Sequence, residues 1–123
     1  MLKFHASIRG GPSAGDALTV TFDAATSALA KLERMFVEPD GSFVWTGIAA
    51  NGRSWQVDGN LIDRGDALAY VELHGRCPDA EFDRLLSVFG RPQAPLAFHL
   101  PQRGMLLDER DFLRLAASVD GAA

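Results

Sequence analysis

The sequence of 123 residues contains a single cysteine, Cys77, so no disulfide can form within one chain. A lone thiol is typical of proteins in a reducing compartment, and we expect a cytoplasmic location. No apolar run approaches the roughly 18 to 20 residues of a membrane-spanning helix, and the first residues carry no signal-peptide pattern, so we expect no membrane association. Basic residues are not in excess: 12 Lys and Arg stand against 16 Asp and Glu, for a formal charge of −4. This balance argues against nucleic-acid binding, which requires clustered Lys and Arg.

Motifs that carry chemistry are also absent. No phosphate-binding loop, dinucleotide fingerprint, His-Glu-x-x-His, Cys-x-x-Cys pair or nucleophile elbow occurs. The sequence His74-x-x-Cys77 is half a metal site and would need further ligands from His5 and His99. A thiol at a helix N-terminus can have a lowered pKa, but the plainer interpretation of Cys77 is a capping or half-buried residue. We therefore assign no catalytic residue, no metal ligand and no cofactor.

The composition is that of one folded domain. Hydrophobic residues make up 47% of the chain and charged residues 23%, which is too apolar for a disordered protein. No repeat, low-complexity tract or long linker divides the sequence. We predict a single globular domain over residues 1–123.

The middle of the chain predicts a four-stranded antiparallel meander over about residues 35–73. Four β-rich runs are separated by three turn signals, Pro39-Asp40-Gly41, Asn51-Gly52 and Arg64-Gly65-Asp66. Pro-Asp-Gly suits a three-residue loop, which pairs odd-numbered residues with odd-numbered ones. Extended to the other turns, this parity predicts one large apolar face, which includes Phe43, Trp45, Trp55, Val57, Leu61, Val71 and Leu73.

The same loops predict a register for the two tryptophans. Trp45 is expected opposite Gly59, and Trp55 opposite Ala49, so that each ring lies over a small neighbour. A two-residue turn at Asn51-Gly52 would put the two rings on opposite faces, and we reject it for that reason.

Two helices are predicted after the meander. Pro78 suits a helix start and Gly90 a helix end, and four apolar residues between them follow helical spacing, namely Phe82, Leu85, Leu86 and Phe89. Asp108 is expected to cap a final helix whose inward residues are Phe112, Leu115, Ala116 and Val119.

The remaining elements complete an α+β fold in which the meander packs on helices and further strands come from both ends of the chain. Strands are expected over residues 2–8 and 95–100, a short strand or turn over residues 104–107, and a helix over residues 25–32. Residues 17–22 fit a strand or a helix, and their β-branched residues favour a strand. The order is β-β-α-β-β-β-β-α-β-β-α. This order and the pI of about 5.2 resemble the small acidic secretion chaperones, without a shared motif, and the resemblance implies a dimer.

The even-numbered face of the meander is half apolar and is the first candidate site. Its apolar residues are Val44, Ile48, Ile62, Leu68 and Tyr70. A solvated sheet face would be more polar, and a fully covered one less so. Either the chain's own N-terminal strand or C-terminal helix covers this face, or the face binds a second copy or a protein partner, with Tyr70 as the anchor. The leading hypothesis is a small cytoplasmic, non-catalytic protein-interaction module that self-associates through this face.

The second candidate is a pair of carboxylates on the same face. The predicted register places Asp58 opposite Glu72 at about 5 Å. Two carboxylates this close repel each other, and a bound cation, an Arg or a shared proton can offset the repulsion. The alternative function is therefore a small hydrolase or metal-dependent enzyme centred on Asp58 and Glu72. The plainer interpretation is that both are solvated surface acids, or that a turn shifts the register by two residues and places them diagonally.

Overall fold

The computed structural model describes residues 1–11 and 17–118. Its elements, in chain order, are β1 (Leu2–Gly10), α1 (Phe22–Leu29), β2 (Met35–Val37), β3 (Ser42–Ile48), β4 (Ser54–Arg64), β5 (Ala67–Cys77), α2 (Asp79–Val88), β6 (Leu96–Leu100), β7 (Met105–Asp108) and α3 (Glu109–Ala116). The predicted α+β class is confirmed. The strand expected over residues 17–22 does not form.

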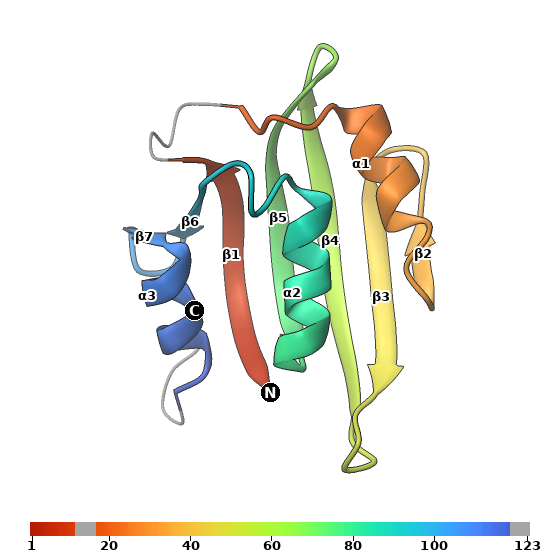
Figure 1. Cartoon of the computed structure of the whole chain (residues 1–123), viewed down its shortest axis with the longest axis vertical. Coiled ribbons are helices and arrows are strands. Elements are labelled where there is room, and N and C mark those ends of the chain that lie inside the picture. The colour runs from red at the N-terminus through yellow and green to blue at the C-terminus, as the bar shows by residue number, and fades with distance from the viewer. Residues whose placement is uncertain (12–16, 119–123) are drawn as a thin grey trace.

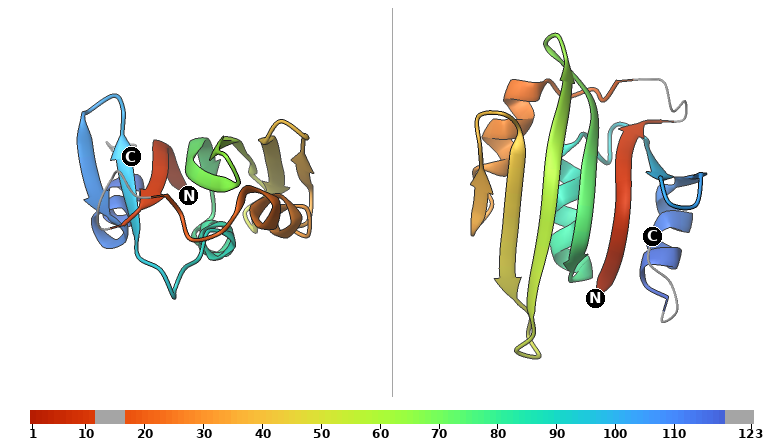
Figure 2. Two further views of the ribbon diagram at one scale, coloured as in Figure 1. Left: turned by 90° about the horizontal axis from the view of Figure 1, so that it is seen from above. Right: turned by 180° about the vertical axis from the view of Figure 1, so that it is seen from behind.

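The strands of the described residues make one antiparallel sheet in the order β2-β3-β4-β5-β1-β6-β7 (Figure 1). The meander is present as β2 to β5 but is only part of this seven-stranded sheet, because β1 pairs with the far side of β5 and carries β6 and β7 beyond it. All three helices of the described chain lie on one side of the sheet, and the view from behind shows the strands uncovered (Figure 2). The molecule therefore has two layers, with the core between helices and sheet.

The predicted parity of the meander is confirmed, and its register is corrected. Alternate residues of β3, β4 and β5 are buried under the helices, and except at Leu68 these are the odd-numbered ones. However, Gly59 lies opposite Phe43 rather than Trp45, and Trp55 lies opposite Gly47 rather than Ala49. The pairing of β3 with β4 is thus shifted by two residues from the prediction, which preserves which face each side chain occupies.

The loop glycines explain this shift. In the first hairpin Glu38 N donates to Ser42 O, and the loop ends with Gly41 at a φ of 94°. In the second hairpin Ala49 N donates to Arg53 O, so the loop is residues 50–52 and it ends with Gly52 at a φ of 83°. The third position of such loops requires the left-handed conformation, which glycine adopts without strain. Each loop therefore places its glycine last.

Large rings do lie over small residues, as expected, but the pairs differ from those predicted. A Cβ atom added to Gly59 would lie 2.0 Å from the Phe43 ring, and one added to Gly47 would lie 2.3 Å from the Trp55 ring. The Trp45 ring packs edge-on against Trp55, with centroids 4.9 Å apart, and its Nε1 donates to Glu33 O at 3.0 Å. The absence of side chains at the two glycines makes room for the aromatic core.

A bulge changes the pairing of β4 with β5. Ile62 pairs with Tyr70, but Asp63 pairs with Leu68, so that Ala69 is an extra residue on β5. Leu68 is fully buried as a result, and its carbonyl accepts a hydrogen bond from Leu18 N at 2.9 Å. The segment predicted as a strand over residues 17–22 thus contacts the end of β5, but it makes only one isolated bridge there, from Thr21 to Ala67.

The helices begin largely where their local signals indicate. Thr21 caps α1 by accepting from Ala24 N at 3.1 Å, and Asp108 caps α3, as predicted, by accepting from Asp111 N at 2.8 Å. Pro78 is the N-cap of α2 rather than its first helical residue. Buried aromatic rings from the neighbouring strands β1 and β6 and from both C-terminal helices meet in one cluster, which consists of Phe4, Phe82, Phe98 and Phe112. Of the residues predicted to face inward on α3, Phe112 and Ala116 are buried and Leu115 is half-buried, while Val119 lies outside the described residues.

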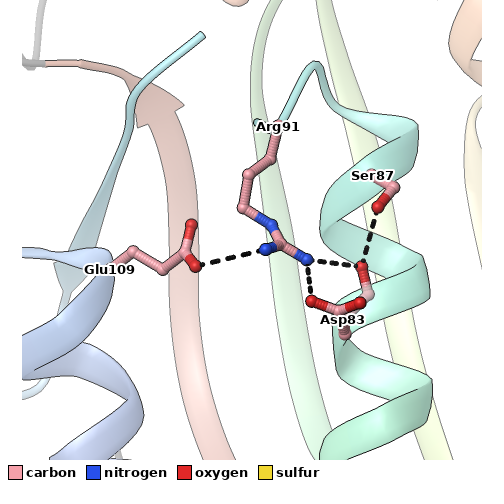
Figure 3. Close-up of polar contacts among 4 residues, drawn as sticks. All are labelled: Asp83, Ser87, Arg91 and Glu109. Atoms are coloured by element: carbon pink, nitrogen blue, oxygen red, sulfur yellow. Dashed lines mark hydrogen bonds and ion pairs between the residues drawn. The ribbon is translucent and has the colours of Figure 1, made fainter. Parts of the chain in front are cut away.

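Arg91 connects α2 to α3 on the helical side (Figure 3). Its Nη2 donates to the backbone oxygen of Asp83 at 2.9 Å and pairs with the Asp83 carboxylate. Its Nη1 lies 3.6 Å from Glu109 Oε2 in the first turn of α3, and Ser87 Oγ donates to the same Asp83 carbonyl at 3.1 Å. One guanidinium thus holds the two C-terminal helices in place, and the opposite face of the sheet takes no part in this contact.

Candidate functional site

The candidate site is the side of the sheet that faces away from the helices, here called the open face. It consists of the even-numbered residues of β2 to β5 up to the bulge, the odd-numbered residues of β1, and His99 on β6. Three rows cross it from strand to strand: Phe36, Val44, Asp58, His74 and His5; then Ser42, Asn60, Glu72, Ser7 and His99; then Thr46, Gln56, Arg76 and Lys3. A fourth pair, Ile62 and Tyr70, stands at the end near the bulge.

No segment among residues 1–11 and 17–118 covers this face. The N-terminal strand, β1, is inserted into the sheet between β5 and β6. The C-terminal helix, α3, lies on the helical side, where Phe112 stacks on Phe98 with ring centroids 4.2 Å apart (Figure 2). Both elements that were candidates for covering the face are therefore placed elsewhere.

The predicted apolar residues of this face have different surroundings. Val44 is 40% and Ile48 65% exposed, and Phe36, which lies opposite Val44, is 73% exposed. Ile62 is half-buried. Leu68 does not belong to the open face, because the bulge turns it into the core, and its assignment to the interaction surface is wrong. Phe36 was missed although the parity of β2 already placed it on the even face.

Tyr70 is in contact with Arg9 of its own chain. The guanidinium carbon of Arg9 lies 3.9 Å from the centroid of the Tyr70 ring, a cation–π contact, and Arg9 Nε donates to Ser7 Oγ at 3.0 Å. The Tyr70 side chain is half-buried, and the contact with Arg9 fixes its orientation. Because Arg9 lies over a face of the Tyr70 ring, a partner can contact the ring edge and the hydroxyl rather than that face.

Asp58 and Glu72 are not opposed. Asp58 pairs with His74 and Glu72 pairs with Asn60, so β5 is shifted by two residues against β4 from the predicted register, and the two carboxylates are diagonal neighbours. Asp58 Oδ1 accepts a hydrogen bond from Gln56 Nε2 at 2.9 Å. The predicted direct pair, and the repulsion expected from it, are wrong because the β4–β5 turn and bulge displace β5 relative to the assumed loops.

These carboxylates line a small hollow together with imidazoles. The hollow measures about 210 Å³, and its polar walls are His5, Asp58, Asn60, Glu72 and His74. The rings of His5 and His74 lie with centroids 5.0 Å apart. Within the described parts of the chain, no three or more His, Cys, Asp or Glu side chains are arranged to hold a metal ion.

Cys77 does not share a site with His74. The two residues are three positions apart on β5 and so face opposite sides of the sheet, with His74 exposed and Cys77 fully buried. Burial, and then the nearby carboxylates of Glu81 and Asp79, raise the pKa of the Cys77 thiol to about 12. The thiol therefore stays protonated near neutral pH, which is unsuitable for a nucleophile or a metal ligand.

No helix in the described residues is both long enough and apolar enough to cross a membrane. No protein-family model, no curated protein and no solved structure matches this chain, so its function must be argued from the site itself.

Proposed function

We propose that this chain is a non-catalytic interaction module that binds a second copy of itself through the open face. The observation that carries the proposal is a reciprocal match between the side chains of β4 and β5 on a face that no described helix covers. A cytoplasmic location belongs to the same proposal and is supported by the single cysteine, Cys77.

The match follows from the observed register. The cross-strand pairs of these two strands on the open face are Gln56 with Arg76, Asp58 with His74, Asn60 with Glu72, and Ile62 with Tyr70. A two-fold axis along the strands between β4 and β5 brings each β4 side chain over the β5 side chain of the same row in the second copy. Every contact is then complementary: amide to guanidinium, acid to imidazole, amide to acid, and aliphatic to aromatic. No two like charges meet, and each pairing occurs twice because a two-fold contact is reciprocal.

The apolar residues at the margin favour the same arrangement. Phe36 and Val44 lie side by side on β2 and β3, and Ile48 follows on β3. Exposed aromatic and aliphatic side chains gathered on two neighbouring strands are typical of contact surfaces. Stacking two sheets face to face at about 10 Å would remove these side chains from water.

A charge exchange tests the proposed contact. Asp58→Lys should raise the dissociation constant of the dimer at least tenfold in sedimentation velocity, because a lysine then faces His74 of the second copy. Adding His74→Asp to the same chain restores opposite groups in that row and should restore the dimer. Glu33→Lys is the matched control, since it makes the same change of charge at an exposed residue next to α2 on the helical side.

The possible outcomes separate the proposal from a loss of folding. Circular dichroism must show that each variant retains its secondary structure. A wild-type protein that is monomeric at about 1 mM, or a folded double variant that stays as monomeric as Asp58→Lys, would refute self-association through this face.

The alternative function, a hydrolase or metal-dependent enzyme centred on Asp58 and Glu72, has lost the geometric argument on which it depended. That argument required two directly opposed carboxylates, and the two residues are diagonal. We therefore do not propose it.

A further inference from the structure

A large hollow lies at the end of the open face that contains the row Thr46, Gln56, Arg76 and Lys3. It measures about 890 Å³, which falls within the range of small-molecule sites. Its walls come from β1, β3, β4 and β5, and Arg34 and Gln102 extend it beyond the strands. Motif analysis gave no sign of it, because its residues come together only through the sheet.

The charge of this hollow is opposite to that of the whole protein. Three cations line it, namely Lys3, Arg34 and Arg76, together with the imidazoles of His5 and His74, and no carboxylate does. The chain has more acids than bases, 16 against 12, so a wall with several bases and no acid is unexpected. The nearest acid identified on the face is Asp58, one row away, where its Oδ1 accepts from Gln56.

The two exposed cations Lys3 and Arg76 are direct cross-strand neighbours on β1 and β5. Like charges in this position are unfavourable for the sheet. Neither forms an ion pair with an acid in the part of the chain that the structure describes. In the next row His5 and His74 are also directly opposed, so four basic side chains stand in two adjacent rows. An anion bound between them would relieve the repulsion and use their hydrogen-bond donors.

Arg34 reaches the same hollow from the segment between α1 and β2. It is the one residue other than glycine with a positive φ in the described chain, at 63°, and its carbonyl accepts from Thr46 N at 3.5 Å. Side chains with this backbone conformation are uncommon and concentrate at functional positions. This conformation places a third cation across the hollow from β1 and β5.

The lining on β3 and β4, between Arg34 and Arg76, is uncharged and partly apolar. It consists of Thr46, Ile48, Ser54, Trp55 and Gln56, with the backbone of Gly47 between them. Of these, Ile48 is 65% exposed and offers its side chain directly to a bound group. A ligand that contacts both the cations and this lining needs an anionic head and an apolar body.

We propose that this hollow binds a small organic phosphate, with the phosphate between Lys3 and Arg76 and the organic group toward Thr46 and Ile48. All of these residues belong to one chain. The site therefore does not require the proposed self-association. Because Gln56 and Arg76 also belong to the proposed contact between copies, the ligand is expected to bind the monomer and to compete with the second copy.

Calorimetric titration with three probes tests the site. Phenyl phosphate carries both the head and the apolar body, inorganic phosphate carries only the head, and benzyl alcohol carries only the body. We expect saturable binding of one phenyl phosphate per chain, at least tenfold tighter than either of the other two. Lys3→Gln and Arg76→Gln should each weaken this binding about tenfold, and Arg76→Lys should retain part of it.

Arg110→Gln is the control, since it removes one positive charge from an exposed position on α3, away from the hollow. The proposal is wrong if phenyl phosphate does not saturate the protein, if it binds no more tightly than inorganic phosphate, or if Arg110→Gln weakens it as much as Arg76→Gln. Urea denaturation of each variant shows whether it is folded, and Lys3 and Arg76 are both exposed enough that the loss of either should leave stability nearly unchanged.

Discussion

Gly59 provides the most direct test of the observed packing. Alanine at this position would place a Cβ atom 2.0 Å from the ring of Phe43, which is itself only 2% exposed and cannot move into solvent. Overpacking of this kind costs about 1 to 3 kcal/mol. Replacing glycine in a strand recovers about 0.5 to 1 kcal/mol, because alanine loses less backbone entropy on folding. Because an approach of 2.0 Å belongs to the upper end of the overpacking range, Gly59→Ala should lower the free energy of unfolding by about 2 kcal/mol.

A double-mutant cycle identifies the ring responsible. Phe43→Leu shortens the side chain over Gly59, so the added methyl group and the smaller side chain should accommodate each other. The loss in the double variant should be smaller than the sum of the single losses by about 1 kcal/mol, since residues in contact couple at this scale. Trp55→Leu is the comparison, because Trp55 lies four residues from Gly59 on the same strand, about 13 Å away, and packs over Gly47. That pair should be additive within about 0.5 kcal/mol.

Urea unfolding followed by circular dichroism measures all of these free energies. The slope of the transition must stay constant across the set, so that the shift of the midpoint reports stability. Equal coupling of Gly59 to both rings, or none to Phe43, would refute the register of β3 and β4 described above. The register predicted from the turn signals alone would instead couple Gly59 to Trp45.

Two further predictions concern single side chains. Burial and neighbouring carboxylates raise the pKa of Cys77 to about 12. A thiol reagent at about pH 8 should therefore label Cys77 slowly in the native protein and rapidly above the urea midpoint. Rapid labelling of the native protein would contradict the burial of Cys77. Hydrogen bonds from the Ser42 hydroxyl and then from the Ser42 backbone N–H lower the pKa of Asp40 below its usual 3.8. The ionised Asp40 side chain therefore stabilises the fold above pH 3.8, and this stabilisation is lost as the pH falls through the lower native pKa. Ser42→Ala should accordingly lower the melting temperature at pH 7, with a difference that becomes smaller as the pH falls well below 3.8. A difference independent of pH would show that Asp40 is not involved.

Much of the fold could be predicted because its signals are local. Alternation of apolar residues identified the buried face of β3, β4 and β5, and helical spacing identified α2. Asp108 was predicted to cap α3 and does so. Each of these depends on residues within one or two turns of a helix, or within one hairpin, so the rest of the chain has little opportunity to override it.

The register could not be predicted from alternation, because a shift of two residues keeps every side chain on its face. A local signal was nevertheless present: Gly41 and Gly52 each end a three-residue loop at positive φ, and placing Gly52 last would have given the observed pairing. The bulge that buries Leu68 had no comparable signal. It accompanies the contact of β5 with Leu18, fifty residues earlier in the chain.

The candidate sites likewise have features that the sequence predicts and features that only the strand pairing decides. That Val44, Ile48 and Tyr70 share a face with Asp58 and Glu72 follows from parity, which the sequence contains. That Asp58 stands beside His74, and that Lys3 stands beside Arg76, follows from how the strands align and from the place of β1 in the sheet.

The amino-acid sequence by itself determined which residues form strands and helices in most of the chain, and which side chains of the meander face the core. The tertiary structure alone decided that β1 lies between β5 and β6, that all three described helices pack on one side, and that the other side is left open. The physical reason is the range of the interactions. Periodicity and capping act over a few residues, whereas strand order is set by burying the apolar faces of distant segments together, and many arrangements satisfy the same local pattern until the whole core is packed.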